Sequence, residues 1–489
     1  MENSGEYMEN TKAAPAQLGD VLVLGLGKSG RAVAKYCLEL IGGRVRTLTI
    51  AAGEKNDAAL EFASTCRMDG VEVLFDQYTF ERHYDVCVAS PGISQFSRFY
   101  ENAQAASDEV ISEVEFAWRE SPADSRWVAI TGTNGKTTTT TLATHLLKAA
   151  GLNVAAVGNI GNTCIDAVAA GEADCFVAEV SSFQLASMRD FAPQVAVLLN
   201  ITPDHLYWHM TLEAYIEAKK KVYANLSSTD GLLVIDAVND TSRSCIREFK
   251  NDPDRAFDYV PLGSAAGLDS SMRETCGSEN AAYLHDGMLR VEFRGETIDL
   301  VSADELQIKG EHNASNALAA SAAALGMGVS PEVIRAGLRT FAPLEHRLEP
   351  CGSVNGVPCF NDSKATNVDA TLKALGSFPA AKPIFLLGGH DKGTELSELV
   401  SSAERHCSAV VCFGTAGKRF MEAFMGSELA HIRVDHMEDA LDAALSMAEP
   451  GTPVVLSPAC ASFDEFDSFE QRGRVFKHLV AFRASDPEA

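Results

Sequence analysis

The feature that most constrains the fold of this chain is a unit that recurs along its length: a short apolar segment, a turn rich in Gly, Ser or Thr, and then a helical segment. The apolar segments of this kind are Val21–Leu24, Trp127–Ile130, Cys175–Val180, Gln194–Ile201, Pro383–Leu387, Ala409–Phe413 and Pro453–Leu456. Continuous apolar strands that alternate with helices are typical of parallel sheets covered on both faces. We therefore predict an α/β fold with mostly parallel sheets, in which ligands bind beyond the carboxyl ends of the strands.

Two breaks indicate how the 489 residues are divided. Ser121–Ser125 is a short Ser/Pro/Asp stretch before a new strand, and Ala342-Pro343 follows the Ala-rich helical run Asn313–Leu325. The polar, irregular stretch Asp240–Glu305 predicts strands and loops that decorate the middle part. The domains predicted from these breaks are residues 1–121, 122–342 and 343–489.

The formal charge of −26 argues against a general nucleic-acid or membrane-surface binder, because phosphates would be repelled. An anionic ligand in a local basic pocket stays possible. No apolar run is long enough for a transmembrane helix, and the polar first seventeen residues do not predict a signal peptide. The twelve cysteines are scattered, without a C-x-x-C pair, which predicts reduced, buried thiols and a cytoplasmic location.

Gly25–Gly30 follows a strand in the pattern G-x-G-x-x-G, which lets the backbone approach a phosphate at a helix N-terminus. A nicotinamide-dependent oxidoreductase would also place Asp or Glu at the end of its second strand, to bind the ribose. Here that strand, Arg44–Ile50, continues into Ala51-Ala52-Gly53, so the oxidoreductase interpretation is weakened. A tight turn without a ligand is the other alternative.

A second turn, Thr131–Thr138, carries the Gly-Lys-Thr end of a P-loop. In such a loop, backbone amides surround phosphates, Lys136 neutralises them and Thr137 reaches Mg²⁺. The first glycine of the full motif would fall at Ile130, so the match is partial. The predicted phosphate-binding residues are Gly132, Thr133, Asn134, Gly135, Lys136, Thr137 and Thr138.

Thr211–Leu226 predicts an amphipathic helix with Thr211 as its N-cap. Lys219 falls near the middle of the apolar stripe, whereas Lys221 falls on the opposite side. A lysine on a buried face must be neutralised, paired or modified. The alternative is a lysine whose amine reaches water past the apolar surface.

Ionisable residues also occur at the ends of two neighbouring apolar strands. Glu179 interrupts the strand Cys175–Val180, and Asp204-His205 follow Gln194–Ile201. Together they would hold a hard cation near the phosphates of the Lys136 loop. For His205 alone, a hydrogen-bonded loop histidine is the alternative.

Three polar turns follow strands in the last part of the chain. They are Asn361–Asn367, after a hairpin signal at Asn355-Gly356, then Gly388–Gly393 and Ser457–Ser462. Three such turns beyond parallel strands predict a ligand cleft. Cys460 lies in the last of them, and we expect it to pack rather than to act as a nucleophile, since no histidine partner is near in sequence.

This combination resembles the Mur ligase family of ATP-dependent amide-bond-forming enzymes over nearly the whole chain. The motifs that carry the resemblance are the P-loop Thr131–Thr137, the Glu-x-Ser-Ser-Phe-Gln-Leu stretch Glu179–Leu185, the Asn-x-x-x-Asp-His turn Asn200–His205, the Ala-Lys-x-x-x-Tyr stretch Ala218–Tyr223, the Gly-x-His-Asn-x-x-Asn stretch Gly310–Asn316 and the pair His346-Arg347. One departure is Tyr207-Trp208, where relatives commonly carry Asp-Arg.

Within the family, the chain looks most like the members that add D-glutamate to UDP-N-acetylmuramoyl-L-alanine. The features that favour this type are Gly25–Gly30, Asn361–Asn367 with Leu387–Gly393, and Ser457–Ser462 running into Phe469–Gly473. The resemblance implies a monomer with a Rossmann-like UDP-binding domain, a central ATPase domain and a Rossmann-like domain for the amino acid. It also implies that ATP converts the substrate carboxylate to an acyl phosphate, which the amine of D-glutamate then attacks.

The resemblance further implies roles for single residues. Lys136, Glu179, His205 and Lys219 would be catalytic, with Thr137 and Glu179 on one Mg²⁺ and His205 and a carbamylated Lys219 on a second. The implied ATP contacts outside the P-loop are Asn316, Arg347 and Asp362. The implied UDP-sugar contacts are Lys28, Ser29, Ser90, Gly92, Asn159 and His205. The implied D-glutamate contacts are Lys364, Thr366, Lys392, Ser462 and Phe469.

Three rival functions remain open from the sequence. An oxidoreductase built on Gly25–Gly30 does not explain Lys136. A nucleotide-binding switch protein would use the P-loop but leaves Glu179, His205 and Lys219 unexplained. A sister ligase that adds another amino acid, or that acts on folate, is disfavoured by the stretch 457–473, through resemblance only.

Overall fold

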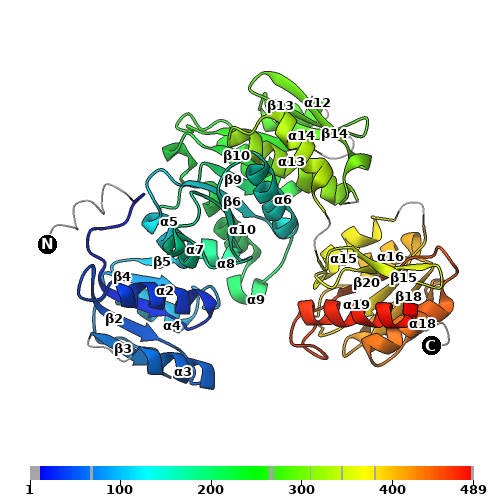
Figure 1. Ribbon diagram of the computed structural model, residues 1–489, viewed down its shortest axis with the longest axis horizontal. Coiled ribbons are helices and arrows are strands. Elements are labelled where there is room, and N and C mark those ends of the chain that lie inside the picture. Colours follow the sequence, from blue (N-terminus) through cyan, green and yellow to red (C-terminus); the bar gives the residue numbers. More distant parts are fainter. Residues whose placement is uncertain are drawn as a thin grey trace. The chain divides into compact units, whose positions relative to one another are not determined.

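The computed structural model describes residues 11–66, 70–263, 268, 270–308, 310–342, 345–378, 381–391 and 393–485. Lys392, one of the expected D-glutamate contacts, lies outside the described residues. The chain divides into two compact units (Figure 1). The first consists of the residues up to Glu305 together with Ser315–Thr340, and the second of Leu306–Ala314 and the residues from Phe341 onward.

The first unit begins with a five-stranded parallel sheet of order β3-β2-β1-β4-β5, which is the Rossmann strand order without the sixth strand. Its strands are β1 (Gly19–Leu24), β2 (Val45–Ala51), β3 (Val71–Leu74), β4 (Val86–Ala89) and β5 (Val110–Ser112). Its helices are α2 (Lys28–Glu39), α3 (Asp57–Thr65), α4 (Arg98–Ala105) and α5 (Glu113–Glu120). Along β1, Val21 and Val23 pack into one core while Leu22 and Leu24 pack into another, so both faces of the sheet are covered.

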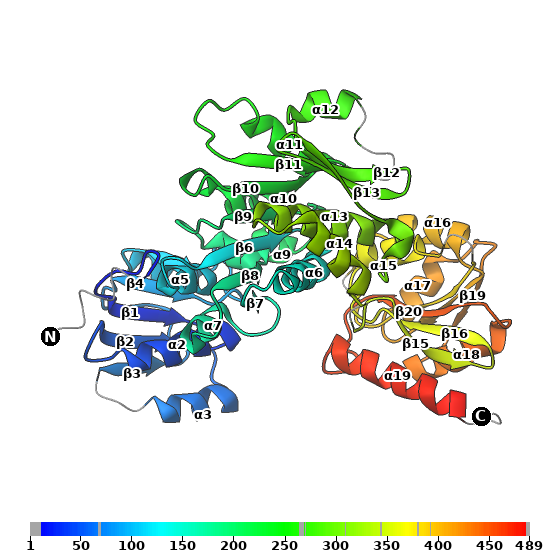
Figure 2. The same cartoon turned by 45° about the horizontal axis from the view of Figure 1, so that its top comes forward.

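A nine-stranded sheet forms the rest of the first unit, in the order β14-β13-β12-β11-β10-β9-β6-β8-β7. Its strands are β6 (Arg126–Thr131), β7 (Val154–Gly158), β8 (Cys175–Glu179), β9 (Val195–Leu198), β10 (Leu232–Asp236), β11 (Asp258–Leu262), β12 (Ala281–His285), β13 (Met288–Phe293) and β14 (Glu296–Ser302). Strands β6 to β12 pair in parallel, whereas β13 pairs antiparallel with both β12 and β14. Figure 2 shows β11, β12 and β13 continuing the sheet from β10, so the irregular stretch Asp240–Glu305 largely extends this sheet.

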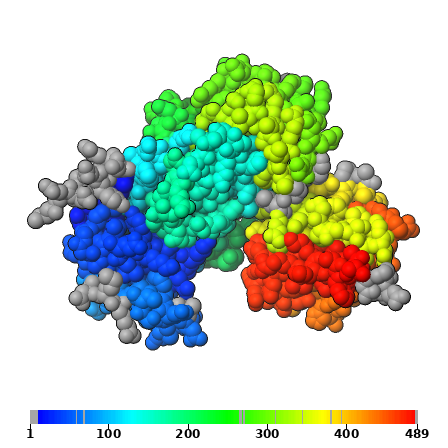
Figure 3. All heavy atoms as spheres, in the orientation of Figure 1, coloured from blue at the N-terminus to red at the C-terminus, as the bar shows by residue number. Residues whose placement is uncertain are grey.

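The helices of this part are α6 (Lys136–Ala149), α7 (Cys164–Ala170), α8 (Ser182–Ala186), α9 (Leu206–His209), α10 (Leu212–Lys220), α11 (Asp240–Phe249), α12 (Ser270–Cys276), α13 (Glu311–Gly326) and α14 (Pro331–Thr340), with 3-10 turns η1 (Lys221–Tyr223), η2 (Leu226–Ser228) and η3 (Ala303–Glu305). The first residues of α13, up to Ala314, are counted with the second unit. Helix α7 packs against α2 and α5 of the five-stranded part. Figure 3 shows these two parts of the first unit, blue and cyan, in direct contact.

The helix expected over Thr211–Leu226 is shorter than predicted. Thr211 caps it as expected, since its hydroxyl accepts from the N–H of Ala214, but the α-helix ends at Lys220 and continues as the 3-10 turns η1 and η2. Beyond Lys220, side chains bond to a neighbouring turn: Asn225 Nδ2 donates to the carbonyls of Arg189 and Phe191. These tertiary contacts override the apolar periodicity that suggested one continuous helix.

The second unit is built on a six-stranded sheet of order β15-β16-β20-β17-β18-β19, parallel except for the hairpin β15–β16. Its strands are β15 (Glu349–Val354), β16 (Val357–Asn361), β17 (Ile384–Gly388), β18 (Ala409–Phe413), β19 (Ala430–Arg433) and β20 (Val454–Ala459). Its helices are α15 (Val368–Leu375), α16 (Ser397–His406), α17 (Gly417–Ala423), α18 (Met437–Met447) and α19 (Phe469–Ser485). Asn355 and Gly356 both have positive φ, which confirms the predicted hairpin turn.

Alternate side chains of β17 show how this sheet is covered. Phe385 and Leu387 pack into a core with α15, α16 and α17, whereas Ile384 and Leu386 pack into a second core with α18 and α19. The parallel α/β class predicted from the sequence is therefore confirmed. All twelve cysteines are free, and eleven of them are buried. Among the described residues, no helix has the length and apolar character needed to cross a membrane.

Candidate active site

The P-loop lies at the carboxyl end of β6, which is flanked in the sheet by β9 and β8. Gly132 and Gly135 both have positive φ, and a Cβ at Gly135 would lie 2.4 Å from Asn316 Oδ1. Only glycine fits such a position without displacing its neighbour. Asn316 Oδ1 also accepts from Thr139 Oγ1 at 3.3 Å, so the structure places this expected ATP contact directly beside the loop.

Asn200, at the end of the neighbouring strand, fixes the loop's shape. The N–H groups of Thr133 and Asn134 donate to Asn200, at 2.7 Å to its carbonyl and 2.9 Å to its side-chain Oδ1. The first N–H groups of α6, which begins at Lys136, have no acceptor within their own helix. An anion is therefore best bound at the start of α6, where these N–H groups and the positive end of the helix dipole coincide. Lys136 Nζ lies over the loop, 2.8 Å from the carbonyl of Thr133.

Glu179 is the last residue of β8 and is 2% exposed. Its Oε1 accepts from Asn159 Nδ2 at 2.8 Å, while its Oε2 is buried and has no hydrogen-bond partner. A buried carboxylate oxygen without a partner is costly. Because β8 and β6 are neighbouring parallel strands, this carboxylate lies at the same sheet edge as the P-loop.

His205 follows β9 and precedes α9, with a left-handed backbone at φ 54°. Its N–H donates to Asp204 Oδ1 at 2.8 Å, and its ring lies against that of Phe183, with centroids 4.7 Å apart. Its side chain is about one-third exposed. The turn after β9 therefore presents the imidazole at the sheet edge that also holds the P-loop and Glu179.

Lys219 is 1% exposed, as its position on the apolar stripe predicted. Its Nζ donates to the carbonyl of Gly132 at 2.8 Å and lies 4.8 Å from the centre of the Tyr215 ring. Burial, and then the nearby charge of Lys136, hold the pKa of Lys219 well below its ordinary value, while Asp204 opposes that shift. The amine does not reach water, so the snorkelling alternative is wrong.

Tyr207 and Trp208, the two residues that depart from the family pattern, lie close after the Asp204-His205 pair in the chain. Trp208 is buried and stacks on Phe183, with ring centroids 4.7 Å apart, whereas Tyr207 is 79% exposed. His209, which the sequence reasoning missed, is fully buried, and its Nε2 lies 2.9 Å from Ser182 Oγ. Burial lowers the pKa of His209 to about 4, so it is a neutral ring that ties α9 to α8.

The expected UDP-sugar residues Lys28, Ser29, Ser90 and Gly92 all line one open cavity of about 360 Å³. The cavity lies at the carboxyl ends of β1 and β4, where the Gly25–Gly30 turn begins α2. Asn159 and His205, which were also expected to contact the UDP-sugar, do not line this cavity; the amide of Asn159 is bonded to Glu179 instead. Lys28 Nζ donates to the carbonyl of Gly161, so the loop after β7 touches both the cavity residue Lys28 and the carboxylate Glu179.

A buried carboxyl supports the same loop. Glu113 Oε1 accepts from the N–H of Ile165 at 2.8 Å at the start of α7, and burial raises its pKa to about 7. The folded state therefore binds this proton more tightly than the unfolded state, and the free energy of unfolding falls as the pH rises from about 4.5 towards 7. We expect Glu113→Gln to remove about 3 kcal/mol of this pH dependence. Urea unfolding of both proteins at pH 5 and pH 8 measures it, and equal losses in the two proteins would contradict the prediction.

In the second unit, Asp362 follows β16 and is buried. Its Oδ2 accepts from Ser457 Oγ at 2.7 Å, and burial raises its pKa to about 7, against the nearby charge of Arg347. Lys364 Nζ lies 3.8 Å from the centre of the Phe469 ring. The hydroxyl of Ser462 is buried and has no partner. Thr366 follows in the same turn, and its N–H donates to the carbonyl of Lys364.

Arg472 is the residue of the second unit that the site prediction missed. It is fully buried and donates to Ser363 Oγ and the Ser363 carbonyl, both at 2.9 Å, and to the carbonyls of Cys460 and Ala461. It thus joins the turn after β16 to the turn after β20. The sequence pattern could have indicated its burial. Arg472 lies four and eight residues before Phe476 and Val480, on the same buried face of α19, just as Lys219 lies on the apolar stripe of its own helix.

Two parts of the chain match known protein families. Residues 130–324 match the Mur ligase middle domain, and residues 346–460 match the glutamate ligase domain of Mur ligases. A UDP-N-acetylmuramoylalanine–D-glutamate ligase from Thermoanaerobacter pseudethanolicus is 38% identical over 94% of this chain and 98% of its own length. The enzyme of the same name from Salinibacter ruber is 39% identical over 94% of this chain and 96% of its own.

Solved structures share the fold at lower identity. A pseudomurein peptide ligase type C from Methanothermus fervidus covers 95% of this chain with a TM-score of 0.56 and 18% identity, and matches over 100% of its own length. UDP-N-acetylmuramate–alanine ligase from Thermotoga maritima covers 96%, with a TM-score of 0.54 and 16% identity, again over 100% of its own length. Together with the sequence relatives, these matches show that the chain belongs to the Mur ligase family.

Proposed function

We propose that this protein is an ATP-dependent ligase that joins D-glutamate to UDP-N-acetylmuramoyl-L-alanine, as a cytoplasmic monomer in peptidoglycan precursor synthesis. Relatives that carry this activity in their names are 38–39% identical over almost the whole chain. The structural observation that carries the proposal is Lys219, a buried amine hydrogen-bonded to the phosphate-binding loop. A simple nucleotide switch leaves this buried amine unexplained, and a dehydrogenase leaves the Lys136 loop unexplained.

The chemistry requires activation of the acceptor. A carboxylate does not react with an amine at neutral pH, so the γ-phosphoryl group of ATP is first transferred to the carboxylate of UDP-N-acetylmuramoyl-L-alanine. The amine of D-glutamate then adds to the acyl phosphate, and the tetrahedral intermediate expels phosphate. Phosphoryl transfer needs positioning and charge neutralisation more than covalent help. In this scheme Lys136 neutralises the β- and γ-phosphates, and the amides at the start of α6 orient them.

The side chains at this sheet edge fit Mg²⁺, because they supply oxygen and imidazole donors and include a buried carboxylate oxygen without a partner. Thr137 and Glu179 would hold one ion, and His205 and a carbamylated Lys219 a second. Bound Mg²⁺ would neutralise the charge that develops on the transferring phosphoryl group. Carbamylation suits Lys219, since a neutral amine reacts with carbon dioxide and its lowered pKa favours the neutral form.

We assign the three expected domains, 1–121, 122–342 and 343–489, to the UDP-sugar, ATP and D-glutamate. Lys28, Ser29, Ser90, Gly92 and Asn159 would serve the UDP-sugar. In the last domain, Asp362 and Arg347 would contact ATP. The residues proposed for D-glutamate are Lys364, Thr366, Lys392, Ser462 and Phe469. Cationic groups beside these turns suit the two carboxylates of the amino acid.

Phosphate release from ATP tests the proposal. The purified protein is supplied with UDP-N-acetylmuramoyl-L-alanine and, in separate reactions, D-glutamate, L-glutamate, L-lysine or diaminopimelate. We expect release with D-glutamate only. Release with another amino acid alone would keep the activation chemistry and overturn the D-glutamate assignment. No release with any of them would overturn the ligase proposal.

A further inference from the structure

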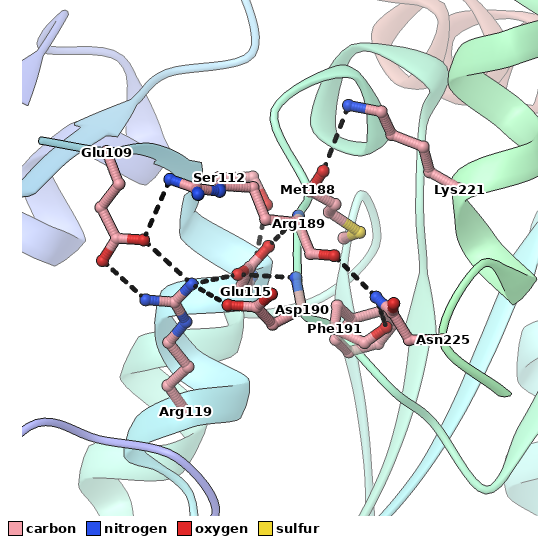
Figure 4. A network of polar contacts seen from close by, with 10 residues as sticks. All are labelled: Glu109, Ser112, Glu115, Arg119, Met188, Arg189, Asp190, Phe191, Lys221 and Asn225. Atoms are coloured by element: carbon pink, nitrogen blue, oxygen red, sulfur yellow. Dashed lines mark hydrogen bonds and ion pairs between the residues drawn. The ribbon is translucent and has the colours of Figure 1, made fainter. Parts of the chain in front are cut away.

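A network of polar contacts holds the turn between α8 and β9, residues 186–191, from two opposite sides (Figure 4). On one side, both oxygens of Glu115 accept from this turn: Oε2 from the N–H of Arg189, and Oε1 from the N–H of Asp190 at 3.1 Å. Glu115 belongs to α5, in the UDP-binding part of the first unit. The N–H groups of Arg189 and Asp190 therefore face α5.

Glu115 is fully buried, and its charge is matched by Arg119 one helical turn later. The guanidinium lies 2.6 Å from Glu115, 2.7 Å from Glu109 and 2.8 Å from Asp190 of the same turn. Figure 4 shows these carboxylates gathered around Arg119. These contacts hold the turn in one geometry, because moving it would break its two N–H hydrogen bonds to the buried Glu115 carboxylate and the ion pair between Arg119 and Asp190.

On the other side, the carbonyl groups of the turn accept hydrogen bonds from the segment that follows α10, the helix that carries Lys219. Lys221 Nζ donates to the carbonyls of Ala186 and Met188, and Asn225 Nδ2 donates to that of Arg189 at 2.7 Å. Lys221 is only two residues beyond Lys219 in the chain. The turn therefore bonds with its N–H groups to α5 and with its carbonyls to the segment that directly follows α10.

Apolar packing holds α8 and α10 together. Leu185 of α8 and Tyr215 of α10 belong to one buried core, and Ala186 and Ala218 belong to a smaller cluster with Trp208. Apolar contacts carry no direction, whereas hydrogen bonds to specific carbonyls do. The polar contacts of turn 186–191 therefore add a directional constraint on α10 to this apolar packing.

We propose that Lys221 and Glu115 are positioning residues for the candidate active site, which consists of the P-loop, Glu179, His205 and Lys219. By holding turn 186–191 from both sides, they fix Lys219 on α10 relative to Glu179 on β8 and to the UDP-binding sheet. This inference rests on the proposed function, since it takes Lys219 and Glu179 to act together on phosphoryl transfer. Neither Lys221 nor Glu115 touches substrate, and both act through the position of Lys219.

The test compares Lys221→Met with Lys221→Arg and with Lys220→Met. Lys220 is the matched control, because it neighbours Lys221 but pairs with Glu217 and Glu248 away from the turn. We expect Lys221→Met to lower kcat at least about tenfold, since small misplacements of reacting groups cost one to two orders of magnitude. The Mg²⁺ concentration for half-maximal activity should rise, with KM for D-glutamate unchanged. Lys221→Arg should recover most of kcat, and Lys220→Met should behave as wild type.

A second readout needs neither substrate nor turnover. Free enzyme in isotope-labelled bicarbonate is examined by NMR for the carbamate carbon of Lys219, which we expect to be weaker in Lys221→Met and normal in Lys220→Met. If wild type gives this carbamate signal but no D-glutamate-dependent phosphate release, the proposed function fails while the positioning test still stands. A Lys221→Met protein with wild-type kcat, Mg²⁺ dependence and carbamate signal would overturn the positioning role. If Lys221→Met does not fold, Glu115→Gln replaces it in the test. We then expect the same results from Glu115→Gln: a lower kcat, a higher Mg²⁺ concentration for half-maximal activity and a weaker carbamate signal.

Discussion

Replacing Lys219 with alanine is expected to lower kcat by about a thousandfold or more. The side chain is buried against the P-loop, and its carbamate would supply the anionic oxygen for a cation at the acyl phosphate. Alanine removes both the oxygen and the amine that forms it. The cavity left behind has the size of a small carboxylic acid, so acetate or formate should restore part of the activity. Phosphate release with and without the added acid measures both effects.

Lys220→Ala is the control for this experiment, because Lys220 lies next to Lys219 on α10 yet pairs with Glu217 and Glu248. It should keep wild-type turnover and show no response to acetate. The thermal unfolding temperature of the Lys219→Ala protein, compared with that of wild type, shows whether a loss of activity comes from the missing amine or from unfolding of the protein. Full activity in a folded Lys219→Ala protein would remove the carbamate from the mechanism.

The second large effect is expected at Lys136. Lys136→Met keeps the length and apolar body of the side chain but removes the charge that, in the proposed function, would neutralise the β- and γ-phosphates. Loss of one such electrostatic partner costs about a hundred- to a thousandfold in kcat. The expected result is a kcat lowered by this factor, measured by phosphate release at saturating ATP.

Lys148→Met is the matched control, because Lys148 lies on the same helix α6 but in its last turn, where it is exposed. It should leave kcat within about twofold of wild type, as surface substitutions usually do. If Lys136→Met and Lys148→Met retained equal activity, Thr131–Thr138 would not be the phosphate site. Because a charge near Lys219 is also removed, the pKa of Lys219 should rise in Lys136→Met.

Local pattern was sufficient for the class of fold and for the position of several candidate site residues in it. Strand periodicity, the Gly-Lys-Thr turn and the apolar stripe around Lys219 are each contained within about twenty residues, and each was found where predicted. The same stripe predicted a helix that is too long. The segment after Lys220 is held by hydrogen bonds to carbonyls of residues 186–191, which are distant in the sequence and so are not part of the local pattern.

Sequence by itself therefore determined the parallel α/β sheets, the place of the glycine-containing loop between β6 and α6, and the burial of Lys219, since these follow from neighbours along the chain. Only the tertiary structure decided that Asn159 bonds to Glu179, that Arg472 joins two turns, and that Lys221 and Glu115 hold one turn between them. Each of these contacts joins residues at least eleven positions apart, and most join residues from different helices and strands. A buried polar group must find its partner wherever the fold brings one within hydrogen-bond distance, and that partner has no fixed spacing in the sequence.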